Sequence, residues 1–181
     1  MNLPNKLTMM RVVLVPVFMI FAAVSHYGTA DFHAAYMLIA GVIFAIASIT
    51  DFLDGYLARK NHLVTDFGKF MDPLADKMLV MAAMCYFVEC GQMPGWCLAI
   101  VLLREFAVSG MRLVAVEQGR VIAAAWSGKV KTASTMVCLC LMLVFQSNLL
   151  NVVCIAVIVA TTMYSGIEYF AKNLDVFKEA D

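Results

Sequence analysis

Charged residues are scarce in this chain of 181 residues, where Asp, Glu, Lys and Arg together make up 14%. A soluble domain of this length carries about 25% charged and about 45–50% apolar residues. Here 63% of the residues are hydrophobic, so the shortage of charge argues against a soluble protein and indicates lipid as the solvent. Internal repeats and low-complexity tracts are also missing, and we expect a single domain over residues 1–181.

Cysteine patterns typical of zinc or redox sites are missing as well. The chain has no Cys-x-x-Cys pair, and no histidine stands near a cysteine. All six cysteines fall in apolar stretches: Cys85, Cys90, Cys97, Cys138, Cys140 and Cys154. This pattern predicts buried, inert thiols rather than a zinc or redox function.

Long stretches without charge supply six candidate membrane spans. No Lys, Arg, Asp or Glu occurs from Val12 to Ala30, from Phe32 to Thr50 or from Thr132 to Ile167. A helix needs about 20 residues to cross a hydrocarbon core of about 30 Å. The sequence therefore predicts an all-α integral membrane protein with six transmembrane helices. The expected spans are about 7–28, 32–58, 70–90, 95–118, 125–146 and 151–170.

Basic residues are concentrated toward one set of connections between these spans, with Lys77 just inside the third span and Arg104 alone near mid-depth. Lys and Arg occur at the start of the first span, between the second and third, between the fourth and fifth, and after the sixth. The opposite turns, near residues 29–31, 91–95 and 147–150, contain neither. By the positive-inside rule, both termini and the charged connections face the cytoplasm. The first span is expected to be retained rather than cleaved as a signal peptide, because five further spans follow.

Four aspartates form the clearest functional pattern. Asp51 and Asp54 are three residues apart at the end of the second span, and Asp72 and Asp76 are four apart at the start of the third. Each pair therefore shares one helix face, and the short connection between the spans brings the pairs together. A charged carboxylate costs up to about 2.5–3.5 kcal/mol at the bilayer centre, and four like charges repel one another. A compensating cation is therefore expected.

The ligand chemistry indicates which cation. Oxygen ligands without His or Cys select hard ions, so we expect Mg²⁺ or Mn²⁺. Two such ions would balance four carboxylates, and a pair of ions is suited to phosphoryl displacement. The alternative is a set of interfacial aspartates that pair with Arg59, Lys69 and Lys77.

Neighbouring residues fit a phosphate-binding site. Gly55 and Gly68 leave room for a phosphate to approach the backbone, although close helix packing is the alternative for each glycine. Arg59 could reach a diphosphate, and Pro73, directly after Asp72, suits the start of a helix.

Together these residues read Asp51-x2-Asp54-Gly55-x2-Ala58-Arg59-x8-Gly68-x3-Asp72-x3-Asp76. The pattern is similar to the signature of the CDP-alcohol phosphotransferase family at every fixed position and spacing. The resemblance implies that family's six-helix membrane fold, usually a homodimer, with an active site open to the cytoplasm. It also implies a reaction in which an alcohol hydroxyl attacks the β-phosphate of a CDP-linked alcohol and CMP leaves.

The same resemblance implies roles for individual residues. The four aspartates would hold two divalent ions, and Asp72 and Asp76 would be catalytic, with Asp76 the candidate general base. Whether Asp76 is base, ligand or both stays open. The residues expected to contact the CDP portion are Asp54, Gly55, Arg59 and Gly68.

Three further stretches resemble one branch of the family, whose members join CDP-diacylglycerol to sn-glycerol 3-phosphate. They are residues 2–11, Arg104-Glu105-x6-Arg112 and Gly128-Lys129-x-Lys131-Thr132. The resemblance implies these two compounds as substrates, phosphatidylglycerophosphate as product and a place in the inner membrane of a bacterium. No nucleic-acid partner is expected.

Basic residues in the fourth and fifth spans independently favour a phosphorylated acceptor. Arg104 lies beside a polar stripe of the fourth span, and a buried cation in a membrane is a functional candidate. Lys129 and Lys131 open the fifth span, where the positive helix end favours an anion. The expected acceptor-phosphate site consists of Arg104, Arg112, Lys129 and Lys131. The alternative is a structural pair of Arg104 and Glu105 with ordinary positive-inside residues.

Two other functions stay open on the sequence. One is a different family member: a phosphatidylinositol-phosphate, phosphatidylserine or cardiolipin synthase. A neutral or zwitterionic acceptor would have less use for the four cations. The other is a divalent-cation transporter, because intramembrane carboxylates mark ion pathways. Both aspartate pairs lie at one membrane edge, whereas transporters more often bind ions near the midplane between repeated halves.

Overall fold

The computed structural model describes residues 3–27, 33–60, 66–120, 122–123, 125–145 and 147–177. For residues 3–7, 33–34, 51–60, 66–73, 76 and 177 it describes the backbone alone. The described residues form six long helices and one short 3₁₀ helix, without a strand, which confirms the all-helical fold class. The long helices are α1 Leu3–Tyr27, α2 His33–Lys60, α3 Asp66–Glu89, α4 Gly95–Glu117, α5 Trp126–Val144 and α6 Asn148–Asn173, and the 3₁₀ helix is η2 Leu174–Phe177.

Helix α3 begins about one turn earlier than the sequence predicts. Its first residue is Asp66, a residue type that is favourable near the positive end of a helix. Pro73 therefore lies inside α3 rather than at its start. Proline in a helix interior removes one backbone hydrogen bond, but the helix continues past it to Glu89.

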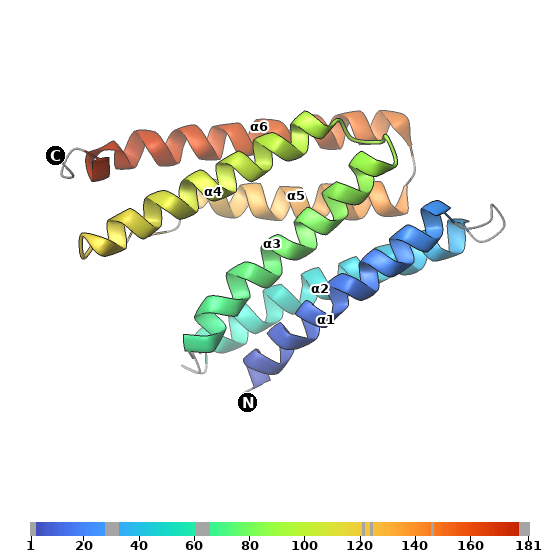
Figure 1. Ribbon diagram of the computed structural model, residues 1–181, viewed down its shortest axis with the longest axis horizontal. Coiled ribbons are helices and arrows are strands. Elements are labelled where there is room, and N and C mark those ends of the chain that lie inside the picture. Colours follow the sequence, from blue (N-terminus) through green and yellow to red (C-terminus); the bar gives the residue numbers. More distant parts are fainter. Residues whose placement is uncertain are drawn as a thin grey trace.

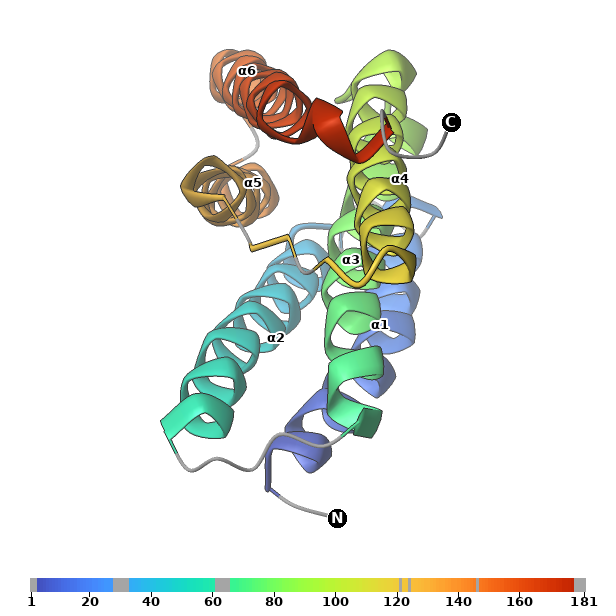
Figure 2. The ribbon, with the colours of Figure 1, turned by 90° about the vertical axis from the view of Figure 1, so that its left-hand side faces the viewer.

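Successive helices run in opposite directions, so their ends gather at the two ends of the molecule (Figure 1). The last turns of α2, α4 and α6 lie at the end where α1, α3 and α5 begin. Helix α1 contacts α2 and α3, while α6 contacts α4 and α5, and α5 also packs against α2 and α3. The two groups of three helices diverge toward the end that carries both termini, as the turned view also shows (Figure 2).

The main hydrophobic core lies where the helices meet. Helix α2 contributes a face at helical spacing, with Met37, Ala40, Phe44 and Ala47 all buried. The rings of Phe44 and Phe18 of α1 are 5.8 Å apart between centroids, in a tilted arrangement. This packing fixes α2 against its neighbours over the turns that precede the two aspartates of α2.

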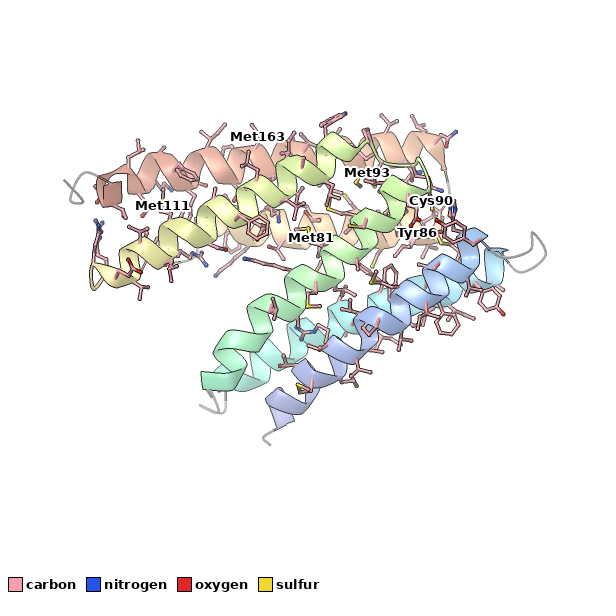
Figure 3. All side chains as sticks on the ribbon, in the orientation of Figure 1. Met81, Tyr86, Cys90, Met93, Met111 and Met163 are labelled. Atoms are coloured by element: carbon pink, nitrogen blue, oxygen red, sulfur yellow. The ribbon has the colours of Figure 1, made fainter. Side chains whose placement is uncertain are left out.

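The outward surfaces of the helices are strongly apolar. On α4, Leu103 and Phe106 are each 72% exposed, and on α6 Leu149 is 77% exposed. Large exposed apolar surfaces are rare in soluble proteins and are normal where lipid is the solvent. Side chains project outward in this way along the helices in Figure 3.

Three helices of the described chain are long and apolar enough to cross a membrane: Thr8–Tyr27, Trp126–Val144 and Asn148–Val176. A shorter apolar segment, Ala35–Thr50, lies within α2. Helix α4 differs from these because it carries Arg104, Glu105 and Arg112. Two of these charged residues, Arg104 and Glu105, belong to the polar site described below.

The end of α4 is defined by a glycine turn. Gly119 has φ +73°, a conformation that favours glycine. The Gly119 N–H donates to Val116 O at 2.9 Å, and the Arg120 N–H donates to Ala115 O at 2.8 Å, as in a Schellman motif. Arg120 then pairs with Asp175 of η2, with 2.7 Å between Nη1 and Oδ2. The ion pair connects the end of α4 to η2, which directly follows α6.

Candidate functional site

The four aspartates lie on two neighbouring helices. Asp51 and Asp54 belong to the last three turns of α2, and Asp72 and Asp76 belong to the first three turns of α3. Helices α2 and α3 contact each other. The side chains of all four aspartates lie outside the described residues, as do those of Arg59 and the surroundings of Gly55 and Gly68.

The donor set at these positions fits a hard divalent ion. Four carboxylates on adjoining helix ends supply only oxygen ligands, which Mg²⁺ and Mn²⁺ prefer. Elsewhere in the described chain, no group of three His, Cys, Asp or Glu residues is placed to hold a metal. The metal and CDP assignments therefore stay predictions that rest on the sequence pattern and on the two helices that carry it.

A network of charged side chains links three helices around Glu105 of α4. Lys131 Nζ lies 2.7 Å from Glu105 Oε1, and Arg104 Nη1 lies 2.9 Å from the same oxygen. Lys77 Nζ of α3 lies 3.7 Å from Glu105 Oε2 and donates to Ser109 Oγ at 2.7 Å. Among these described side chains, three cations share one carboxylate, which leaves an excess of two positive charges. We call Lys77, Arg104, Glu105 and Lys131 the basic network.

Most of the basic network is buried. The side chain of Lys131 is 5% exposed, and those of Arg104 and Glu105 are 13% and 14% exposed. Lys77 is the most accessible of the four, at 39%. Buried charges are expensive unless they are paired, and a net positive charge of this kind favours an anionic ligand. The basic network is therefore a candidate anion-binding site.

The other two predicted cations lie outside this network. Arg112 Nε donates to Tyr169 Oη at 3.0 Å, and its guanidinium carbon lies 5.4 Å from the centre of that ring. Lys129 is exposed, and its Nζ lies 5.9 Å from the centre of the Trp126 ring. Lys129 and Lys131 point to different sides of α5, because residues two apart do not share a helix face.

Several residues of the site were not identified from the sequence. The sequence indicates Lys77 only as a partner of the aspartates, and it indicates no role for Ser165 or Tyr169 of α6. The available signal was weak: Ser165 and Gly166 are a pair of small residues within a long uncharged stretch, a pattern that close helix packing also produces.

The expectation of buried cysteines is wrong for part of the chain, and one cysteine meets a histidine that is distant from it in the sequence. Cys90 Sγ lies 3.4 Å from His26 Nδ1, although the two residues are 64 positions apart. Helices α1 and α3 run in the same direction, so their last turns meet, and Figure 3 shows Cys90 at this end of α3. Cys97, Cys138 and Cys154 are buried as expected, but Cys85 is exposed.

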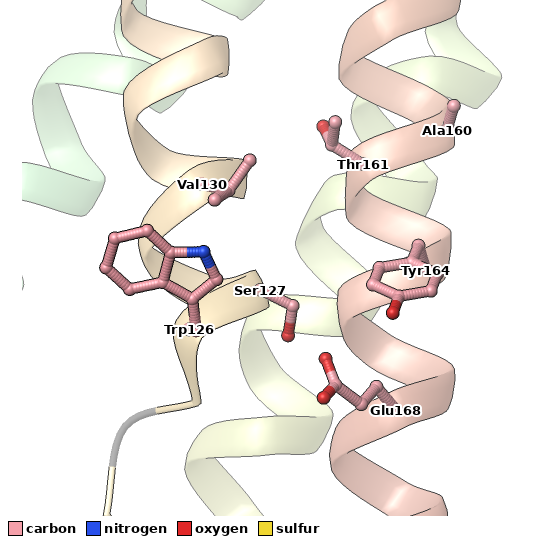
Figure 4. A pocket seen from close by; sticks show the side chains of 7 residues that line it. All are labelled: Trp126, Ser127, Val130, Ala160, Thr161, Tyr164 and Glu168. Atoms are coloured by element: carbon pink, nitrogen blue, oxygen red, sulfur yellow. The ribbon is translucent and has the colours of Figure 1, made fainter.

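A separate pocket of about 400 Å³ lies between α5 and α6 (Figure 4). Its lining is mainly apolar and aromatic, with Trp126 76% exposed and Tyr164 66% exposed. The carboxylate in this lining, Glu168, pairs with Lys172 one turn further along α6. The lining contains none of the basic network, so this pocket is distinct from the candidate anion site.

Comparisons with known proteins agree with the motif on α2 and α3. The family model described as CDP-alcohol phosphatidyltransferase matches residues 1–164. A Bacillus subtilis (strain 168) protein named CDP-diacylglycerol–glycerol-3-phosphate 3-phosphatidyltransferase is 41% identical over 192 residues, covering 99% of both chains. A probable phosphatidylglycerophosphate synthase of Mycobacterium tuberculosis (strain H37Rv) is 39% identical over 176 residues, covering 96% of this chain and 82% of the relative. A Salmonella typhimurium (strain LT2) protein with the same name as the Bacillus relative is 38% identical over 144 residues, covering 76% and 74%.

Proposed function

The chain belongs to the CDP-alcohol phosphatidyltransferase family, and on that premise we propose that it transfers the phosphatidyl group of CDP-diacylglycerol to sn-glycerol 3-phosphate. The products are phosphatidylglycerophosphate, a precursor in phospholipid synthesis, and CMP. The names of relatives that match at 38–41% identity support this choice of substrates. The observation that carries the choice of acceptor is the positive excess around Glu105.

The charge of the basic network suits a phosphate monoester. Such a group carries about −1.5 to −2 charges at pH 7, which would balance the excess of two positive charges. A neutral or zwitterionic acceptor would leave buried cations uncompensated. We assign the acceptor phosphate to Arg104 and Lys131, with Arg112 and Lys129 as outer residues that attract the anion toward them.

The reaction then follows from the proposed roles of the aspartates. Asp51, Asp54, Asp72 and Asp76 would hold two ions of Mg²⁺ or Mn²⁺, which neutralise the diphosphate and stabilise the departing CMP when bound. The acceptor hydroxyl oxygen forms a bond to the β-phosphorus, while the bond from that phosphorus to the CMP oxygen breaks. The hydroxyl proton passes to the Asp76 carboxylate, which is positioned on α3 one residue before Lys77 of the basic network.

The remaining residues of the motif would bind the CDP portion. Gly55 and Gly68 have no side chain to obstruct a phosphate or nucleotide that approaches α2 and α3. Arg59 would pair with the diphosphate, for which a guanidinium is well suited because it donates two parallel hydrogen bonds.

We propose that all six helices cross the inner membrane of a bacterium, with both termini and the aspartate end in the cytoplasm. The alternating helix directions and the positive-inside pattern support this orientation. The acyl chains of CDP-diacylglycerol would stay in the bilayer against the exposed apolar faces, while the head group reaches α2 and α3. A homodimer is proposed from family membership.

The decisive experiment is CMP release by the purified protein in detergent, with CDP-diacylglycerol and Mg²⁺. Glycerol 3-phosphate would be compared with inositol phosphate, serine, glycerol and phosphatidylglycerol as acceptors. CMP formed only with glycerol 3-phosphate is the expected result. Release of CMP with serine, glycerol or phosphatidylglycerol would refute the assignment of the basic network, whereas release with inositol phosphate would refute only the choice of glycerol 3-phosphate. If no acceptor yields CMP but proteoliposomes take up Mg²⁺ or Mn²⁺, the chain is a transporter and the proposal is wrong.

A further inference from the structure

The Arg104 side chain reaches from α4 to α6, where it is held at a defined position. Its Nη2 donates to Ser165 Oγ at 2.6 Å, and its Nη1 donates to Glu105 Oε1 at 2.9 Å. Ser165 is fully buried, so water cannot replace Arg104 as the hydrogen-bond partner of its hydroxyl. Two ends of the guanidinium are thus fixed by two different helices.

Two glycines leave the space through which this side chain passes. A Cβ added at Gly166 would lie 3.3 Å from Arg104 Cγ, which is closer than ordinary van der Waals contact. A Cβ added at Gly128 of α5 would lie 3.5 Å from Arg104 Nη2 and 3.9 Å from Ser165 Oγ. By contrast, a Cβ at Gly110 of α4 would meet no described atom within 4 Å. We call Gly128, Ser165 and Gly166 the Arg104 seat.

The seat leaves part of the guanidinium available. Arginine has five N–H donors, and the contacts above use one on each terminal nitrogen. The Arg104 Nε is buried and has no hydrogen-bond partner among the described residues. An unpaired buried donor is costly, which indicates that a ligand completes its hydrogen bonding. The remaining donors lie in the same network as Lys131, which shares the Glu105 oxygen with Arg104.

We propose that Ser165 and Gly166, together with Gly128, are positioning residues that orient Arg104 toward the phosphate of the acceptor. This inference rests on the proposed function, because the anion is identified as the acceptor's phosphate. A planar guanidinium binds a phosphate strongly only when its donors face the oxygens, so a small rotation of Arg104 weakens acceptor binding. Ser165 and Gly166 lie just beyond residues 1–164, the part of the chain that the family model matches. The family model therefore assigns them no role.

The test uses Ser165→Ala, which removes the hydroxyl that holds Nη2, and Gly166→Ala, which pushes against Arg104 Cγ. We expect each to raise the KM for glycerol 3-phosphate about tenfold, the effect of losing one hydrogen bond to a charged group. The kcat and the KM for CDP-diacylglycerol should change by less than about twofold, since the aspartate motif is untouched. Ser165→Thr, which keeps a hydroxyl, should recover most of the acceptor affinity.

Gly110→Ala is the matched control, because it adds the same methyl group to α4 where the structure leaves open space. It should keep both KM values. If Gly166→Ala does not fold, Ser165→Ala decides the question alone. Unchanged KM for glycerol 3-phosphate in Ser165→Ala would overturn the inference. Equal increases in both KM values, with a lower melting temperature, would also overturn it by indicating a merely structural contact.

A binding measurement separates this inference from the proposed reaction. Calorimetric titration with inorganic phosphate, in the absence of CDP-diacylglycerol, should show binding to the wild-type protein and about tenfold weaker binding to Ser165→Ala. If phosphate binds with this dependence but glycerol 3-phosphate yields no CMP, the proposed function is refuted. The role of the Arg104 seat in phosphate binding is then still supported. Equal phosphate affinity in both proteins, or none in the wild type, would refute the seat.

Discussion

Lys131 of α5 and Glu105 of α4 form a buried ion pair, with 2.7 Å between Nζ and Oε1 and side-chain exposures of 5% and 14%. Glu105 also accepts a hydrogen bond from Arg104 and faces Lys77, so one carboxylate stabilises cations from three helices. Glu105 therefore has two roles that can be measured separately. It holds α3, α4 and α5 together, and it keeps the cations in place without cancelling their charge.

Replacement of Glu105 should destabilise the protein. Glu105→Gln leaves Lys131 and Arg104 buried without a counter-charge, and breaking a buried pair in this way costs about 3–5 kcal/mol. Thermal unfolding in detergent should therefore show a clearly lower melting temperature. Glu117→Gln, at the exposed end of the same helix, serves as the control and should shift the unfolding free energy by less than about 0.5 kcal/mol. Equal melting temperatures for the two variants would contradict the network.

The two lysines of α5 should differ in their contribution to acceptor binding. Lys131 belongs to the buried network, whereas Lys129 is exposed beside Trp126. We expect Lys131→Met to raise the KM for glycerol 3-phosphate roughly ten- to hundredfold. Lys129→Met should raise it less, because an exposed charge is screened by water and salt. Steady-state kinetics at two salt concentrations would measure both, and a larger effect at Lys129 would count against the assignment.

The metal proposal is tested most directly at Asp72. Asp72→Asn keeps the size of the side chain but removes its charge, so the helix should form while the ion loses a ligand. We expect kcat to fall by at least about a hundredfold, because metal ions supply several kcal/mol of stabilisation to such reactions. CMP release measures the loss, and an unchanged melting temperature shows that the variant is folded. Normal activity would remove Asp72 from the metal site.

Chelation offers a second test that needs no mutation. EDTA should stop CMP release, and added Mg²⁺ or Mn²⁺ should restore it, since both are hard ions that accept oxygen ligands. Zn²⁺ should restore it poorly, because the four-carboxylate set contains neither the His nor the Cys ligands typical of zinc sites. Full activity in the presence of excess EDTA would exclude a metal-dependent reaction.

Much of the protein could be predicted from local sequence patterns. The six helices follow from long apolar stretches, and the aspartate motif follows from spacings within two adjacent helices. The start of α3 differs from the prediction because Pro73 is typical of a first helical residue, whereas it lies about two turns inside the helix that begins at Asp66. Patterns of this kind depend on periodicity over a few residues, which a single sequence displays in full.

What the sequence by itself determined is therefore the number of helices and their apolar character, together with the pattern of aspartates from which a metal site is predicted. Only the tertiary structure decided which cations meet Glu105, that Lys131 rather than Lys129 faces inward, and that Ser165 and Gly166 receive Arg104. Arg104 and Ser165 are 61 positions apart, and no local pattern connects them. Their contact depends on how α4 and α6 pack and rotate against each other, which is set by the whole bundle at once.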